Sequence, residues 1–320
     1  MSAGARAARS LAALLLLGQL VAASAADVAV PDAVASAVHV TDDAERFADL
    51  LVRTAYRPSE RELDLGYLSP GSDTLRAFAE GRIGTGAELA TAVEVLRADY
   101  RLAVERCLPA ARDLLADLPG LLTATRDALG LGADAPAPDV VVLFGAGRSA
   151  GTVINDTVVL ALEVICRFAA PDQDPVELLR GFLVHEVVHV HQLRWQRPDL
   201  EDSLLRQAML EGYADLITER VLGMAIPPAR ERARFGRQHE ARLWSAFRED
   251  MGGLDLAPWM YGPGRPGEPP DLGYWLGLRI SEAVLAGPGV EPALRRSLLQ
   301  LEDPFSLLSQ SRYGEDFESP

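Results

Sequence analysis

Two histidines lie four residues apart in the segment HEVVH, and a glutamate follows the first of them; they are His185, Glu186 and His189. In an α-helix, residues four apart share a face and lie about 6 Å apart along the axis. Two imidazoles at that spacing can bind one zinc ion at about 2.0–2.1 Å. Glu186 would lie beside the remaining coordination position and accept a proton from water there. The segment therefore predicts a hydrolytic site with one zinc ion per chain.

The sequence around this segment predicts a buried helix. Asp174 is a candidate N-cap, Pro175 takes the first helical position, and Glu177 gives a spacing like that of a capping box. Apolar residues from Leu178 to Leu193 then surround nearly every side of the helix. Buried histidine and glutamate side chains are costly unless a partner satisfies them, and a metal ion would do so.

The next helix is expected to supply the third ligand. Residues 197–200 break the first helix, and Asp202 or Ser203 can cap the second. Such a short connection favours an antiparallel helix hairpin. From His189 the first helix rises roughly 10 Å, and the second descends roughly 12 Å to Glu211. Glu211 therefore returns to the level of the histidines and completes a predicted His₂Glu site with an open position for water.

Asp215 lies four residues beyond Glu211, on the same helix face. Zinc-bound imidazoles usually donate their other ring nitrogen to a carboxylate or a carbonyl. Asp215 is therefore the candidate partner of His185, and the alternative is a solvated helix aspartate.

The sequence indicates a donor that could stabilise an oxyanion less clearly than it indicates the metal ligands. Tyr274 follows a flexible loop and is the main candidate, the alternative being an aromatic core residue. Tyr261, on the loop, is a weaker one. His239 lies on a polar helix, where a solvated histidine is favoured. His191 points away from the metal face, and His39 carries no pattern.

Hydrophobic periodicity predicts the elements that position these residues. Residues 41–131 are expected to be helical, with Thr41 as an N-cap, a short helix at 75–83 and a longer one at 88–107. Residues 130–139 are a predicted linker. Strands are expected at 140–144 and 157–165, with a hairpin turn at 155–156. A loop is expected at 252–271, and two final helices at 272–285 and 291–301.

These elements predict an α+β fold that is predominantly helical, with a small β-sheet and an active-site helix pair. The predicted boundaries are a signal peptide at 1–25, a helical N-terminal region at 26–135 and a catalytic domain at 136–320. The signal rests on Arg6 and Arg9, an apolar run at 11–21 and small residues at 23–25. It indicates a secreted or periplasmic protein that is not integral to the membrane after cleavage.

Charge and cysteine content narrow the possible partners. The net charge is −15, the opposite of the basic footprint that nucleic-acid binding requires. The two cysteines, Cys107 and Cys166, either pair in an oxidising compartment or pack as buried thiols. The expected partner is a peptide or protein substrate.

The HEVVH segment and the EGYAD segment at 211–215 resemble the gluzincin, or thermolysin-like, zinc metallopeptidases. His185, Glu186, His189, Glu211 and Asp215 match that pattern position by position. The segments YLSPGSDTLRAF, GTVINDTVVLALE and LGYWLGLRISEAV look like an uncharacterised family of predicted zinc-dependent proteases, distantly similar to gliding-motility lipoproteins. The resemblance implies peptidase chemistry and a zincin-like core at 136–320. It also suggests residues 157–163 as an edge strand that binds extended peptide, the alternative being an ordinary sheet strand.

Three functions remain open at this point. The first is a zinc peptidase in which Glu186 activates water and then protonates the leaving amine. The second is a non-catalytic, zinc-binding envelope protein that acts in binding or assembly. The third is a zinc hydrolase of a non-peptide bond. Glu186 favours the enzymes, because a purely structural site needs only ligands.

Overall fold

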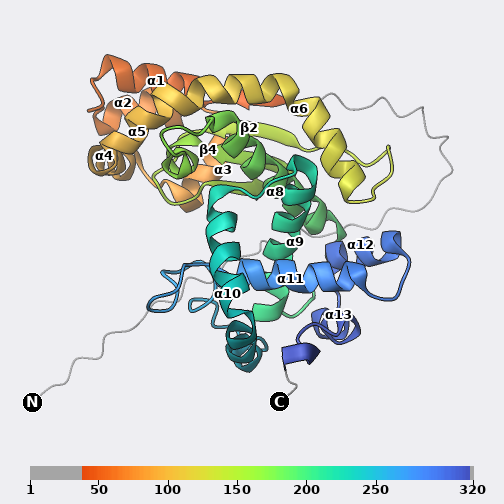
Figure 1. Cartoon of the computed structure of the whole chain (residues 1–320). Coiled ribbons are helices and arrows are strands. Elements are labelled where there is room, and N and C mark those ends of the chain that lie inside the picture. The colour runs from red at the N-terminus through yellow and green to blue at the C-terminus, as the bar shows by residue number, and fades with distance from the viewer. Residues whose placement is uncertain (1–37, 318–320) are drawn as a thin grey trace, which may run out of the picture. The chain divides into compact units, whose positions relative to one another are not determined.

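The computed structural model describes residues 38–317, which are predominantly helical and contain a four-stranded sheet (Figure 1). The α+β class predicted from the sequence is therefore confirmed. The α-helices are α1 (Ala44–Arg53), α2 (Glu60–Leu63), α3 (Asp73–Arg82), α4 (Gly86–Val95), α5 (Arg97–Leu102), α6 (Leu108–Ala128), α7 (Leu162–Ile165), α8 (Pro175–Trp195), α9 (Leu204–Leu222), α10 (Pro227–Asp250), α11 (Leu272–Ala286), α12 (Glu291–Gln300) and α13 (Pro304–Ser311). Short π-helical segments are η1 (Asp64–Leu68) and η2 (Ala103–Cys107), and 3₁₀ turns are η3 (Cys166–Phe168) and η4 (Glu315–Phe317).

The sheet has the strand order β1-β2-β4-β3. Its strands are β1 (Val40–Asp42), β2 (Asp139–Leu143), β3 (Gly151–Ile154) and β4 (Thr157–Ala161). β1, β2 and β4 run parallel, and β3 is antiparallel to β4. The hairpin predicted at Asn155 and Asp156 is confirmed, since both residues have positive φ, at 47° and 63°.

The prediction that residues 157–163 form an edge strand is wrong. β4 lies inside the sheet, between β2 and β3, so β3 is the edge strand. The strand predicted at 157–165 also ends at Ala161, where α7 begins. Both errors have one cause: a short, fully buried apolar run does not distinguish strand from helix or edge from interior.

The N-terminal helices differ from prediction at two places. Thr41 belongs to β1 and is not an N-cap. The sequence did not indicate this strand, because it is three residues long and pairs with β2, about a hundred positions later in the chain. The helix predicted at 88–107 is divided into α4, α5 and η2, with a break at Leu96, where φ is −102° and ψ is 25°. The short helix at 75–83 is confirmed as α3.

At the C-terminal end, both predicted helices are confirmed as α11 and α12, and an additional helix, α13, follows them. The loop predicted at 252–271 lies between α10 and α11. Its Pro and Gly content explains why no regular element forms there.

Helix α8 lies at the centre of the described residues. One cluster of buried apolar side chains comes from the sheet and the helices before α8, and it includes Leu183 and Val187. A second comes mainly from α9 to α13 and includes Val188 of α8. In Figure 1, α8 runs between the sheet and the crossing helices α9 and α11. The prediction of a helix buried on nearly all sides is thus confirmed.

Cys107 and Cys166 form a disulfide that joins η2 to η3. The sequence left open a disulfide or two buried thiols, and the structure contains the disulfide.

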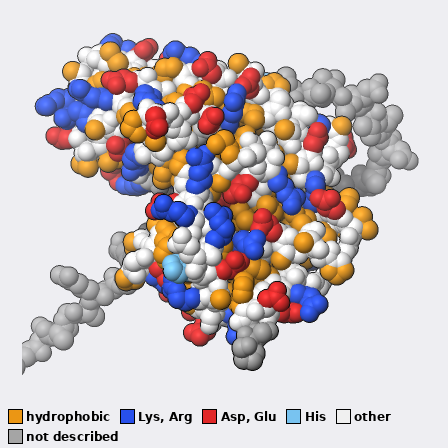
Figure 2. Space-filling view, viewed as in Figure 1, with side chains coloured by type: hydrophobic (Ala, Val, Ile, Leu, Met, Phe, Trp, Pro, Cys, Tyr) orange, Lys and Arg blue, Asp and Glu red, His pale blue; other side chains and the backbone are white. Residues whose placement is uncertain are grey.

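The face shown in Figure 2 carries arginine and acidic side chains interspersed with hydrophobic ones. Within residues 38–317, no helix is both long and apolar enough to cross a membrane. The predicted signal peptide at 1–25 lies outside the described residues.

Candidate metal centre

The antiparallel pair of α8 and α9 brings the predicted ligands together. Asp174 caps α8 by accepting a hydrogen bond from the Val176 amide at 2.9 Å, and Pro175 is the first helical residue. Ser203, one of the two predicted caps, starts α9 by accepting from the Arg206 amide at 3.1 Å. These caps fix where each helix begins, and thereby the level at which their side chains meet.

His185, His189 and Glu211 form a compact cluster whose ligand atoms all lie within 4.8 Å of one another. The two Nε2 atoms are 3.0 Å apart, and each lies 3.1 Å from Oε2 of Glu211. Ligands at about 2.0–2.1 Å in a tetrahedral zinc site lie about 3.3 Å from one another. The cluster could hold a metal ion. The distances between its ligand atoms are slightly shorter than those in a tetrahedral zinc site, so small side-chain movements would accommodate the ion.

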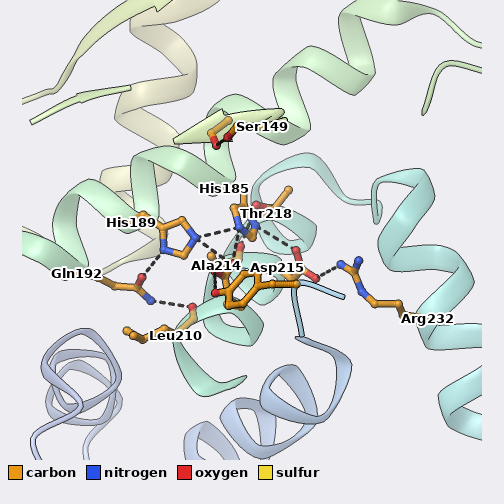
Figure 3. Close-up of polar contacts among 12 residues, drawn as sticks. Ser149, His185, His189, Gln192, Leu210, Ala214, Asp215, Thr218 and Arg232 are labelled. Atoms are coloured by element: carbon orange, nitrogen blue, oxygen red, sulfur yellow. Dashed lines mark hydrogen bonds and ion pairs between the residues drawn. The ribbon is translucent and has the colours of Figure 1, made fainter. Parts of the chain in front are cut away.

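Both imidazoles are oriented through their second ring nitrogen (Figure 3). Nδ1 of His185 lies 3.1 Å from Oδ1 of Asp215, which confirms the predicted pairing. Nδ1 of His189 lies 2.6 Å from Oε1 of Gln192, whose amide group donates to the Leu210 carbonyl at 2.9 Å. With Nδ1 donating in both rings, both Nε2 lone pairs point towards the cluster.

Two residues that help to orient the imidazoles, Arg232 and Gln192, were not found from the sequence. Arg232 of α10 donates to Oδ2 of Asp215 at 2.7 Å in a buried ion pair. Gln192 lies three residues after His189, so helical spacing could have indicated it. Arg232 had no local signal, because α10 packs against the site only in the folded chain.

The electrostatics of the cluster favour ionised carboxylates. Burial opposes the charge of Glu211, but the neighbouring His189 and His185 outweigh it and hold its pKa well below the usual range. Burial likewise opposes the charge of Asp215, but Arg232 and His185 lower its pKa. Burial also disfavours charged His185, yet hydrogen bonds to Asp215 and Glu211 raise its pKa to about 10. A metal ion would displace that proton, since imidazole binds metal as the neutral base.

Glu186 stands apart from the ligand cluster and faces the edge strand. It is 7% exposed, and burial raises the pKa of its carboxyl group. A Cβ atom at Gly151 of β3 would overlap the Glu186 carboxylate, so the strand can approach only because residue 151 is glycine. Glu186 is therefore held between α8 and β3, beside the His₂Glu cluster.

A cleft of about 950 Å³ contains the cluster and Glu186. One wall is the segment leading into β3, where Ser149 lies across from the histidines (Figure 3). Tyr261 and Tyr274 also line the cleft. The cleft thus joins an open sheet edge to the three candidate ligands.

The edge strand β3 has backbone N–H and C=O groups that are not hydrogen-bonded to β4. The Ala161 amide donates to the Ala150 carbonyl at 2.8 Å, and the hairpin pairs Ile154 with Thr157. Because hydrogen-bonded pairs alternate along an antiparallel ladder, Gly151 and Val153 turn their N–H and C=O groups away from β4.

Both predicted phenols lie at the cluster. The ring of Tyr274 stacks near that of His185, with centroids 6.3 Å apart, and Arg232 lies 4.7 Å from its centroid. Burial raises the pKa of Tyr274, so its hydroxyl remains a donor. Tyr261, the weaker candidate, donates directly to Oε1 of Glu211 at 2.6 Å.

The other weighed histidines lie elsewhere. His239 sits at a kink in α10, where φ is −130°, and its ring packs 4.5 Å from that of Phe235. His191 is buried, which lowers its pKa to about 4, and it belongs neither to the cluster nor to the residues that line the cleft.

Comparisons with family models, with curated proteins and with solved structures each returned no match. The resemblance to gluzincin peptidases therefore stays a prediction, and function must be argued from the geometry of the cleft.

Proposed function

We propose that this protein is a zinc-dependent peptidase. The observation that carries the proposal is the placement of Glu186, which lies buried in the cleft beside His185, His189 and Glu211 without belonging to their cluster. A structural site needs only ligands, and it has no use for an extra carboxylate whose burial is costly.

The donor set favours zinc among the common metals. Two imidazole nitrogens and one carboxylate oxygen, with a fourth position left to the cleft, form a familiar set for catalytic zinc. A zinc ion bound there would polarise the scissile carbonyl and lower the pKa of water. His185 and His189 are already oriented for ligation by Asp215 and Gln192.

The chain's own residues then divide the proton chemistry. Glu186 accepts a proton from the attacking water and passes it to the leaving nitrogen, a task suited to a carboxylate whose pKa is raised by burial. Tyr274 keeps its phenol proton and donates a hydrogen bond to the developing oxyanion. The stacking of Arg232 on Tyr274 and its ion pair with Asp215 hold these groups in one arrangement.

An extended peptide is the substrate that suits the cleft. Gly151 and Val153 turn N–H and C=O groups away from β4, where a chain lying along β3 could pair with them, as in strand addition. The Gly151 carbonyl also accepts a hydrogen bond from the Ser149 hydroxyl at 2.8 Å. A chain bound in this way would lie beside β3, the strand whose Gly151 packs against the Glu186 carboxylate. The Cys107–Cys166 disulfide supports a secreted or periplasmic location for this activity.

The test is zinc content and peptide hydrolysis of the purified full chain beside Glu186→Gln. We expect one zinc ion in each protein, hydrolysis of a broad peptide library by the wild type, and loss of that activity on chelation. The Glu186→Gln variant should be slower by about 10²–10⁴-fold. A wild-type chain without stoichiometric zinc would reject the site. Zinc-loaded wild type that hydrolyses no more peptide than Glu186→Gln would reject the peptidase.

A further inference from the structure

The two carboxylate oxygens of Glu211 have different partners. Oε2 faces both imidazoles, at 3.1 Å from each Nε2. Oε1 accepts a hydrogen bond of 2.6 Å from the hydroxyl of Tyr261. The carboxylate is therefore presented to the candidate metal position through one oxygen, while the other is already engaged.

The loop between α10 and α11 holds Tyr261 in this position. Tyr261 has a left-handed backbone with φ of 59°, and its amide donates to Oδ1 of Asp271 at 2.7 Å. Asp271, which precedes α11, is left-handed too, with φ of 59°. Such a conformation is unfavourable for a non-glycine residue, so it persists only where surrounding contacts enforce it.

Contacts around Trp259 provide that enforcement. Trp259 is fully buried, and its indole N–H donates to Oδ2 of Asp250 at 2.8 Å. Arg265 lies 3.8 Å from the centroid of the indole and pairs with the same Asp250 oxygen at 3.0 Å. The loop is thus anchored on both sides of Tyr261, although Tyr261 itself is 58% exposed.

We infer that Tyr261 is a positioning residue that makes Glu211 a single-oxygen metal ligand. Two-oxygen ligation by Glu211 would fill the coordination position that water and substrate need. The hydrogen bond to Oε1 opposes this and fixes the rotation of the carboxylate. Because the Tyr261 proton is committed to Glu211, Tyr261 is not available as a donor to a substrate. The need for an open coordination position rests on the proposed function, whereas the effect of Tyr261 on metal binding by Glu211 does not.

The test is the zinc affinity of Tyr261→Phe in the full chain, measured by competition with a chelator. Removing a partner of a metal ligand typically weakens binding about 10–100-fold, and we expect a loss in that range. Tyr313→Phe is the matched control, because it removes a phenol that donates to Oε1 of Glu240 at 3.0 Å, outside the cluster. Its zinc affinity should equal that of the wild type. An unchanged affinity for Tyr261→Phe would overturn the inference.

A second measurement separates positioning from general loosening of the loop. Cobalt(II) can replace zinc, and its absorption spectrum reports the coordination number. We expect Tyr261→Phe to shift the cobalt spectrum towards higher coordination as Glu211 binds through both oxygens, and Tyr313→Phe to leave it unchanged. An unchanged spectrum in Tyr261→Phe would overturn the single-oxygen role even if affinity fell.

The two proposals fail separately. Tyr261-dependent zinc binding in a chain that hydrolyses no peptide would keep this inference and reject the peptidase. Glu186-dependent hydrolysis by a chain whose zinc affinity ignores Tyr261 would do the reverse.

Discussion

Asp215 accepts a hydrogen bond from His185 through one carboxylate oxygen and from Arg232 through the other, at 3.1 Å and 2.7 Å. All three side chains are buried, and Arg232 lowers the pKa of Asp215 so that it stays charged. A carboxylate can only accept, so Nδ1 of His185 carries a proton, and Nε2 is the atom that would bind a metal ion once its own proton is displaced. α10 is thereby connected to the candidate metal position through Arg232, Asp215 and His185.

The first prediction concerns Asp215→Asn. An amide has one accepting oxygen in place of the two that face His185 and Arg232, and it lacks the charge that supports His185 as a ligand. We expect zinc affinity to fall about 10–100-fold in a chelator competition assay. Asp199→Asn breaks an exposed ion pair with Arg197 on the loop between α8 and α9, and it should leave zinc binding unchanged. Wild-type affinity in Asp215→Asn would show that Asp215 does not orient the ligand.

The second prediction concerns the contact between Gly151 and Glu186. A methyl group at residue 151 would overlap the Glu186 carboxylate and push it from its place beside the cluster. Gly151→Ala should therefore lower kcat/KM for peptide hydrolysis by about 10²-fold, since a displacement of about 1 Å can cost that much. Zinc affinity should not change, because Glu186 is not among the ligands.

Gly120→Ala in α6 provides the control for this change. A Cβ there meets nothing within 4 Å, so both rate and zinc affinity should match the wild type. Full activity in Gly151→Ala would mean that Glu186 can work from another position or does not act as the base.

The candidate site was predictable wherever local geometry determined it. Helical periodicity places His185 and His189 on one face, and the rise per residue returns Glu211 to their level. The same helical spacing places Asp215 four residues beyond Glu211, on the same face of the helix. These positions are confirmed because a capped helix hairpin leaves its side chains little freedom.

What the sequence did not reveal depends on packing between distant segments. Arg232 reaches Asp215 only when α10 folds across the site, and β3 becomes the edge strand only when β4 pairs with β2. Tyr261 was ranked below Tyr274, because loop conformation has no periodic signal. Its backbone is left-handed, and its amide donates a hydrogen bond to Asp271, ten residues later.

The third prediction concerns the crossing of α9 and α11. A Cβ at Gly277 would overlap the backbone of Ala208, and one at Gly212 would overlap that of Gly277 and Leu278. Backbone cannot move aside as a side-chain end can, so Gly277→Ala must separate the helices that carry Glu211 and Tyr274. We expect the free energy of unfolding in urea to fall by about 3 kcal/mol or more.

Gly81→Ala in α3 is the comparison for that measurement. Nothing lies within 4 Å of a Cβ at this position, and alanine favours a helix by up to about 1 kcal/mol. It should be neutral or stabilising. A Gly277→Ala variant as stable as Gly81→Ala would contradict the close helix crossing.

The fourth prediction is a pH dependence of stability that originates at His191. Burial lowers the pKa of this histidine from 6.5 to about 4 in the folded chain. Between those values the unfolded chain binds a proton that the folded chain does not, so stability falls as pH decreases. The loss attributable to His191 should approach about 3 kcal/mol, from about 1.4 kcal/mol per unit of pKa.

Carboxylates also titrate in this range, so the measurement is a difference between proteins. The free energy of unfolding is measured in urea at pH 7 and pH 4.5 for the wild type and for His191→Gln. The wild type should lose more stability than His191→Gln over this interval. His39→Gln replaces an exposed histidine near the start of β1 and should follow the wild type. Equal losses in wild type and His191→Gln would show that His191 is able to take up its proton without unfolding the chain.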